Sequence, residues 1–310
     1  MSEASEKASN NALVASHYNA IPTVNLEARK RSYVRSGDRV LDIACGKGGD
    51  LRKYVTGKVS EVVGLDLAEN SIKEAQKRYS ELRNPKLFAR FYTCDCFTED
   101  ISKVIEPSDY IADLASIQFA LHYAFESEVK VRTLLKNVST HLKEGGVFVG
   151  TTTNAMYLKK KLESVPGLEF GNSVYNVRFE KKESDGIYGQ KYWFFLEDAI
   201  SDCHEYLVHF PRLVEVAQDY GLDLLFVRGF HEFYQENSSN HYFRDLLFLM
   251  KVIGHDGSGP SSDEWEAAGK DQNTTKLKRG KSKEQAFVGA KNHLLKLSPE
   301  SVVWLEEEEV

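Results

Sequence analysis

The sequence lacks any long apolar run. No stretch of its 310 residues approaches the roughly 18 consecutive apolar side chains that a membrane-spanning helix needs. Its first eleven residues are polar and contain no apolar core of the kind found in signal peptides. We therefore expect no membrane span.

Cysteine is scarce as well, with four residues in the whole chain. Cys94 and Cys96 are separated by a single residue, which is too close for the usual zinc-binding pair, and Cys45 and Cys203 stand apart. We predict no metal site, and we expect Cys45 to be a free thiol in a reducing compartment.

An excess of basic residues is also missing. The chain has 40 Lys and Arg residues against 46 Asp and Glu residues, which gives a net charge of −6. An acidic chain is not expected to coat nucleic acid in general, so any RNA should be bound through a small part in a local basic pocket. With 42% hydrophobic residues, the chain can still bury a sizeable core, in one large domain or two small ones.

The most informative pattern that is present is a glycine-rich segment between two apolar runs. Residues 40–50 read Val-Leu-Asp-Ile-Ala-Cys-Gly-Lys-Gly-Gly-Asp, and residues 64–66 read Gly-Leu-Asp. This predicts a strand, a turn that lets the backbone approach a ligand, a helix, and a second strand whose acid accepts hydrogen bonds from a ribose. The pattern indicates a nucleotide-like cofactor.

The charges around this turn favour a cationic ligand. Asp42 precedes the turn, Asp66 ends the second apolar run, and Asp95 ends a third. Three carboxylates suit the sulfonium and ammonium groups of S-adenosylmethionine (SAM) better than the pyrophosphate of NAD. NAD and a turn that binds no ligand remain the alternatives.

Strands and helices should alternate through the first half of the chain. We expect strands at 39–45, 61–65, a run ending at Asp95, 110–117 and 147–152, with helices at 48–55, 69–79 and 126–142, the last stopped by Gly145 and Gly146. This alternation predicts a parallel, doubly wound α/β sheet.

The pattern changes after Thr153. We expect short strands at 173–179, 190–196 and 206–210 to form a small antiparallel insertion, followed by a helix at 211–220 and a strand at 222–227. The expected organisation is a partly disordered N-terminal segment (1–36), one domain (37–256), and a linker with a polar tail (257–310).

Four blocks of sequence, in the same order, resemble the eukaryotic mRNA cap guanine-N7 methyltransferases. They are residues 41–51, 117–126 (Ile-Gln-Phe-Ala-Leu-His-Tyr-Ala-Phe-Glu), 170–175 (Phe-Gly-Asn-Ser-Val-Tyr) and 204–210 (His-Glu-Tyr-Leu-Val-His-Phe). The resemblance runs from about His17 to about Ala267. Its Gln-Phe-x-x-His-Tyr block is specific, because SAM enzymes in general do not share it.

The resemblance implies a class I SAM-dependent methyltransferase fold (Rossmann-like) and methyl transfer to N7 of the guanine cap at the 5′ end of mRNA. It also implies a nuclear location, with other capping or transcription proteins as possible partners of a monomer. The residues that it assigns to SAM are Ala44, Gly46, Asp66, Asp95, Gln118 and Tyr123. Those that it assigns to the capped RNA end are Lys47, Lys53, Arg78, His122 and Glu205.

The chemistry of this reaction asks for positioning rather than for acid–base groups. Guanine N7 already carries a lone pair, so we expect no general base, no covalent intermediate and no metal. The Glu205 carboxylate can accept hydrogen bonds from guanine N1–H and from its exocyclic amine, which distinguishes guanine from adenine. His122 and Tyr123 would pack against the guanine and the methionine moiety. Lys47, Lys53 and Arg78 would bind the triphosphate, unless they form only a solvated basic face.

Two segments typical of the family are missing from the sequence. An Asn-Asn-Trp-x-Lys helix is absent between residues 17–19 and the first strand, and no apolar strand directly follows the segment 262–267. Residues 301–305 are too distant in sequence to be expected as its substitute, so we expect an unpaired sheet edge beside 222–227. These losses leave open a catalytically weakened regulatory or spliced form. A SAM enzyme that acts on a small molecule remains a separate alternative.

Overall fold

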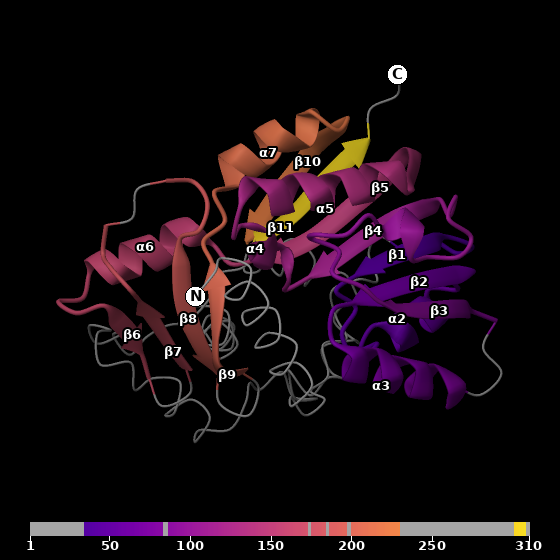
Figure 1. Ribbon diagram of the computed structural model, residues 1–310, viewed down its shortest axis with the longest axis horizontal. Coiled ribbons are helices and arrows are strands. Elements are labelled where there is room, and N and C mark those ends of the chain that lie inside the picture. The colour runs from indigo at the N-terminus through magenta and orange to yellow at the C-terminus, as the bar shows by residue number, and fades with distance from the viewer. Residues whose placement is uncertain are drawn as a thin grey trace, which may run out of the picture.

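The computed structural model describes residues 34–82, 86–172, 175–183, 186–196, 200–229 and 301–307. Residues 17–19, at the start of the family resemblance, and the segment 262–267 lie outside this range. Figure 1 shows a large sheet with helices on both faces and a smaller sheet beside it. None of the helices in these ranges is long and apolar enough to cross a membrane.

Within the described residues, the large sheet has seven strands in the order β10-β11-β5-β4-β1-β2-β3. The strands are β1 (Arg39–Ile43), β2 (Glu61–Asp66), β3 (Phe88–Thr93), β4 (Ala112–Gln118), β5 (Leu142–Thr152), β10 (Leu222–Gly229) and β11 (Ser301–Glu307). Strands β1 to β5 pair in parallel, whereas β11 runs antiparallel to both of its neighbours. The predicted doubly wound α/β fold is therefore confirmed, with an antiparallel strand near one edge.

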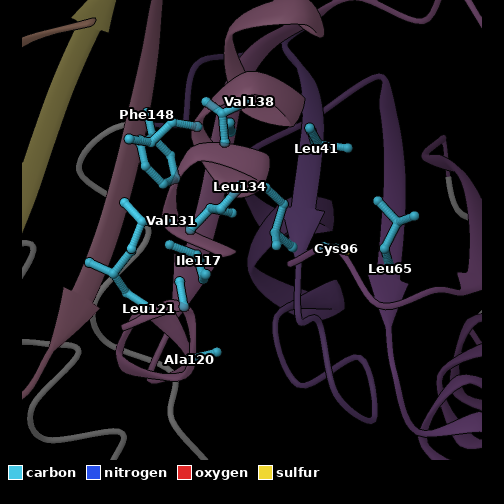
Figure 2. Close-up of a cluster of buried hydrophobic side chains, with 14 of the residues drawn as sticks. Leu41, Leu65, Cys96, Ile117, Ala120, Leu121, Val131, Leu134, Val138 and Phe148 are labelled. Carbon is cyan, nitrogen blue, oxygen red and sulfur yellow. The ribbon is translucent and has the colours of Figure 1, made fainter. Parts of the chain in front are cut away.

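Helices cover both faces of this sheet because its central strands are apolar on both sides. The helices of the described residues, including α6 on the second sheet, are α2 (Leu51–Thr56), α3 (Glu69–Ser80), α4 (Leu121–Ala124), α5 (Glu128–Thr140), α6 (Ala155–Glu163) and α7 (Phe210–Gln218), with a 3₁₀ turn at Ile101–Lys103. On one face, Leu41, Leu65 and Ile117 share a core with Leu134 and Val138 of α5, as Figure 2 shows.

The other face packs against α2 and α3. Val40 and Val62, each one residue away from a residue of the first core, join Tyr54 of α2 and Ile72 of α3. Successive side chains of a strand point to opposite faces, so adjacent apolar residues such as Val62 and Val63 of β2 supply one core each.

The predicted antiparallel insertion is present, but among the described residues it has four strands rather than three, in the order β6-β7-β8-β9. Its strands are β6 (Glu169–Gly171), β7 (Tyr175–Phe179), β8 (Lys191–Leu196) and β9 (Ile200–Tyr206). Leu158 and Leu162 of α6 are buried with Phe170, Val177 and Tyr192 in a third core. The second sheet therefore has a core of its own.

The strand predicted at 206–210 is wrong. Strand β9 ends at Tyr206, and α7 begins at Phe210 with Pro211 in its first turn, where proline is favoured. The apolar pair between them misled the prediction. Leu207 packs in the core of the second sheet and Val208 in the core of the large sheet, so these residues bridge two cores outside any strand.

The helix predicted at 126–142 is shorter than expected. The Ser127 side chain caps α5, which ends at Thr140, and β5 begins at Leu142. Gly145, with φ of 66°, and Gly146 therefore lie inside β5, where its register with β4 shifts. The glycine pair marks a bulge in a strand rather than the end of a helix.

The expected unpaired edge beside β10 is also wrong. Strand β11 lies between β10 and β5 and pairs with both over its length, as its yellow arrow in Figure 1 shows. Part of the segment 257–310, predicted to be only a linker and polar tail, therefore completes the large sheet. The sequence separation of 71 residues between β10 and β11 hid this pairing.

Candidate functional site

The glycine-rich turn after β1 has the backbone that the sequence predicted. Ala44, Gly46 and Gly48 all have positive φ, at 53°, 53° and 68°. A Cβ atom on Gly48 would lie 2.9 Å from Leu51 Cδ1 and 3.1 Å from Ala75 Cβ, so this glycine lets the turn pack against α2 and α3. Apart from its chain neighbours, no atom of the described residues lies within 4 Å of the Cβ position of Gly46, so this side of the turn is open to a ligand.

Asp66 ties the end of β2 to this turn. Its buried carboxylate accepts hydrogen bonds from the backbone N–H of Gly46 and of Ala68, both at 2.8 Å. Burial raises the pKa of Asp66, and these two donors together oppose that rise. The predicted ribose acceptor therefore also has a structural role, which does not exhaust the acceptor capacity of its two oxygens.

Asp95 follows β3, and Gln118 is the last residue of β4. The buried Asp95 carboxylate accepts from the N–H of Phe97 at 3.0 Å, and the Gln118 amide donates to Ser116 Oγ at 3.2 Å. Because carboxyl ends of parallel strands share one edge of a sheet, Asp66, Asp95 and Gln118 all belong to the edge where α/β proteins bind ligands.

Asp42 contributes differently from the expectation. Its carboxylate is buried and hydrogen-bonded to the Tyr54 hydroxyl beneath α2, and Ser116, its register partner on β4, bonds to the same hydroxyl. The Asp42 charge still helps to raise the pKa of Asp66. This buried trio was not found in the sequence, because Tyr54 and Ser116 carry no motif.

Helix α4 brings the specific block of the sequence against β9. His122 and Tyr123 are both buried, with ring centroids 4.4 Å apart, and the Tyr123 hydroxyl lies 3.7 Å from Cys203 Sγ. His122 Nε2 lies 3.6 Å from Glu205 Oε1, beyond hydrogen-bond distance. Burial lowers the pKa of His122 to about 3, so the imidazole is neutral near pH 7 and this contact is not an ion pair.

Glu205 is buried and not a solvated acid on a strand. Burial raises its pKa to about 7, and a hydrogen bond from Tyr192, with an O–O distance of 2.5 Å, opposes that rise. The Tyr192 hydroxyl also lies 3.1 Å from Thr153 Oγ1. Tyr192 and Thr153 were missed by the sequence analysis, although the alternation of β8 could have pointed to a buried Tyr192.

The three predicted phosphate-binding cations occupy different environments. Lys47 lies in the glycine turn between Gly46 and Gly48. Lys53 on α2 is only 4% exposed and pairs with Asp50 at 2.5 Å, so it is not part of a solvated basic face. Arg78 on α3 pairs with Glu74 at 3.3 Å. The cations of α2 and α3 thus already have carboxylate partners.

All four cysteines are free thiols, as expected for Cys45. Among the residues that the structure describes, no group of three or more His, Cys, Asp or Glu side chains could hold a metal ion.

Comparisons with known proteins point to one family. The family model for the mRNA (guanine-N(7))-methyltransferase domain matches residues 33–271. The mRNA cap guanine-N(7) methyltransferase 1 of Arabidopsis thaliana is 37% identical over 94% of this chain and 88% of its own length. The mRNA cap guanine-N(7) methyltransferase of Saccharomyces cerevisiae is 41% identical over 76% of this chain and 58% of its own length.

A relative of the same name in Cryptococcus neoformans is 38% identical over 83% of this chain, which spans 46% of that protein. The solved structure of the CcbJ methyltransferase from Streptomyces caelestis shares the fold, with a TM-score of 0.53, 11% identity and 96% of each chain covered. Family membership supports SAM as the cofactor predicted from the sequence. The chain belongs to the mRNA (guanine-N7)-methyltransferase family.

Proposed function

We propose that this chain transfers the methyl group of SAM to N7 of the guanine cap at the 5′ end of mRNA. The observation that supports this most directly is Glu205, a buried carboxylate that faces His122 of α4, the helix that directly follows β4 and Gln118. A buried acceptor in this position suits a base that presents adjacent N–H donors, as guanine does at N1 and at its amine.

The residues at the carboxyl end of β1 to β4 fit the cofactor. The open side of Gly46 admits a ligand close to the backbone, and Asp66, Asp95 and Gln118 offer hydrogen-bond acceptors and a donor. We propose that these residues, with Ala44 and Tyr123, hold SAM. When bound, SAM supplies an activated methyl group on a sulfonium.

The residues of this chain would act by binding and orienting. Glu205 would fix the guanine ring, and neutral His122 and Tyr123 would pack beside it without taking a proton, since N7 carries none. Holding two reactants in line can lower a barrier by about 7–11 kcal/mol. Lys47, Lys53 and Arg78 would neutralise the triphosphate. Lys53 would then interact with both Asp50 and the triphosphate, and Arg78 with both Glu74 and the triphosphate.

Location and partners follow the same reasoning. We propose a nuclear monomer that acts on the capped RNA end together with other capping or transcription proteins. We also propose that the catalytic domain begins near residue 37, after the N-terminal segment 1–36, and that it includes β11 as well as residues 37–256.

The test is a methyl-transfer assay with the full chain and methyl-labelled SAM. The substrates are one RNA sequence with a GpppN cap, an ApppN cap, a plain triphosphate end or a premethylated cap. We expect label only in the GpppN RNA, and nuclease digestion should release it as 7-methylguanosine in the cap dinucleotide. Equal label in the GpppN and triphosphate RNAs would reject cap methylation.

A further inference from the structure

We propose that Tyr192 is a positioning residue for methyl transfer, whose hydroxyl keeps Glu205 ionised and oriented for guanine. This inference depends on the proposed function, in which Glu205 binds the guanine base. Tyr192 belongs to none of the four sequence blocks that resemble the family.

The backbone places Tyr192 directly opposite Glu205. The two residues are register partners on the antiparallel strands β8 and β9, so their side chains leave the sheet on the same face. The Tyr192 ring is 1% exposed and stacks on Phe179, with centroids 5.6 Å apart. A ring held in this way delivers its hydroxyl to one fixed point, 2.5 Å from Glu205 Oε2.

The direction of the hydrogen bonds follows from counting protons. Tyr192 has a single hydroxyl proton, and an ionised Glu205 can only accept. The phenol therefore donates to the carboxylate, and the Thr153 hydroxyl, 3.1 Å away, donates to the phenol oxygen. Thr153, Tyr192 and Glu205 therefore form a row of two hydrogen bonds, in which each bond polarises and strengthens the other.

In the described part of the chain, no other group around Glu205 favours its charge. The titratable groups that contact it or couple to it in the described part of the chain are Tyr192 from β8, His122 from α4 and Cys203 from β9. His122 is neutral near pH 7, and burial raises the pKa of the Cys203 thiol to about 11, so that it stays protonated. The Tyr192 hydroxyl is thus the donor that opposes the burial of the carboxylate.

This arrangement has a consequence for guanine recognition. An ionised carboxylate accepts from both guanine donors, whereas a protonated one presents its own O–H to one of them. Because the pKa of Glu205 is raised to about 7, we expect kcat/KM for a capped substrate to fall on the acid side of pH 7. Loss of the Tyr192 hydroxyl should move this fall to higher pH.

The experiment measures kcat/KM for the cap dinucleotide GpppA, at saturating SAM, from pH 5.5 to 9 in the full chain. A hydrogen bond to a charged group corresponds to a shift of roughly 1–2 pH units. We therefore expect Tyr192→Phe to move the acid limb up by about one unit or more, with roughly tenfold loss at pH 6.5 and recovery to near the wild-type value at pH 9. Thr153→Val should shift the limb in the same direction by less.

The matched control is Tyr110→Phe, which removes an equally buried hydroxyl that donates to the carbonyl of Val40 at 3.0 Å. It should leave the acid limb in place. If Tyr192→Phe lowers kcat/KM by one constant factor at every pH, Tyr192 is merely structural and the inference is wrong.

Thermal unfolding of the same proteins separates the two proposals. If Tyr192 stabilises the ionised carboxylate, the gap in Tm between wild type and Tyr192→Phe should widen as pH rises from 5.5 to 9. If the wild-type chain methylates no GpppA at any pH, the proposed function is wrong. The unfolding curves would still show whether Tyr192 stabilises the ionised form of Glu205. A gap that stays constant with pH overturns the inference even in an active enzyme.

Discussion

The two halves of the candidate site are built in different ways. The half around Asp66 is assembled from residues 39–95, and its carboxylate is satisfied by the backbone N–H groups of Gly46 and Ala68. The half around Glu205 joins α4, β8 and β9, and its carboxylate has a tyrosine hydroxyl and a neutral imidazole as neighbours. The Asp66 carboxylate accepts from the backbone and so fixes the shape of the turn. The Glu205 carboxylate has fewer donors, so it can still accept hydrogen bonds from a ligand, but its burial lowers the stability of the fold.

The largest effect should come from removing β11, because the part of the large sheet that contains β5 and β10 depends on a strand distant in sequence. Deleting residues 301–310 would leave β10 without its partner and expose one edge of β5. We expect loss of cooperative thermal unfolding, followed by circular dichroism, and poor solubility.

The control for this truncation is deletion of residues 308–310 alone, which leaves β11 whole and should behave as wild type. A 301–310 deletion that melts at the wild-type temperature would show that the large sheet does not need β11.

Asp66→Ala tests the half that is local in sequence. The change leaves the buried N–H of Ala68 and the partly buried N–H of Gly46 without their acceptor, and an unsatisfied buried donor costs about 1–3 kcal/mol. We expect the free energy of unfolding, measured with urea, to fall by about 2–4 kcal/mol, and SAM binding, measured by calorimetry, to be lost. Asp66→Asn keeps one oxygen acceptor and should lose less stability and less SAM affinity than Asp66→Ala. Unchanged stability in Asp66→Ala would contradict the structural role of this carboxylate.

Glu205→Ala tests the non-local half and should separate substrate from cofactor. We expect kcat/KM for GpppA at pH 8 to fall about a hundredfold, because the guanine N–H donors lose their buried acceptor. SAM affinity should stay within a few-fold of wild type. Glu180→Ala, which removes an exposed acid just after β7, should change neither quantity. Equal losses of SAM affinity and activity in Glu205→Ala would contradict the division of the site into two halves.

The same contrast explains what could be predicted from the sequence. The turn after β1 and Asp66 lie within about 25 residues, and their pattern of apolar runs, glycines and acids encodes the geometry locally. Tyr192 could not be found in this way, because its contact with Glu205 depends on the register of β8 with β9. Glu205 and His122 were assigned through the family resemblance rather than through their spacing.

Strand β11 shows the same limit for the fold. Residues 301–307 read as a short apolar run followed by acids, and no local feature indicates that they pair with β5 and β10. The strand prediction at 206–210 failed for a related reason. Two adjacent apolar residues are expected both in a buried strand and in a loop whose residues pack into two separate cores, as Leu207 and Val208 do.

The smallest expected effect is the change in stability on Glu205→Gln, and its sign depends on pH. The pKa of Glu205 is raised from 4.5 in the unfolded chain to about 7 in the fold, so between these values the folded state holds a proton that the unfolded state has lost. The corresponding stability is fully present below about pH 4.5 and is lost as pH rises through 7. Glutamine is neutral at every pH and does not lose it.

We therefore expect Glu205→Gln to melt near the wild-type temperature at pH 5 and above it at pH 8, by on the order of 2 kcal/mol, or several degrees. The glutamine oxygen can still accept from Tyr192, and its amide can donate to the neutral His122 ring. Glu144→Gln, the same change at an exposed position of β5, should show no such dependence. Asp66→Asn should instead be less stable than wild type at pH 8, because each Asp66 oxygen accepts a backbone hydrogen bond and the amide nitrogen of asparagine cannot accept one of them. If Glu205→Gln is destabilised at pH 8 as much as Asp66→Asn is, the fold stabilises the Glu205 carboxylate as strongly as that of Asp66. The proposed difference between the two halves would then be wrong.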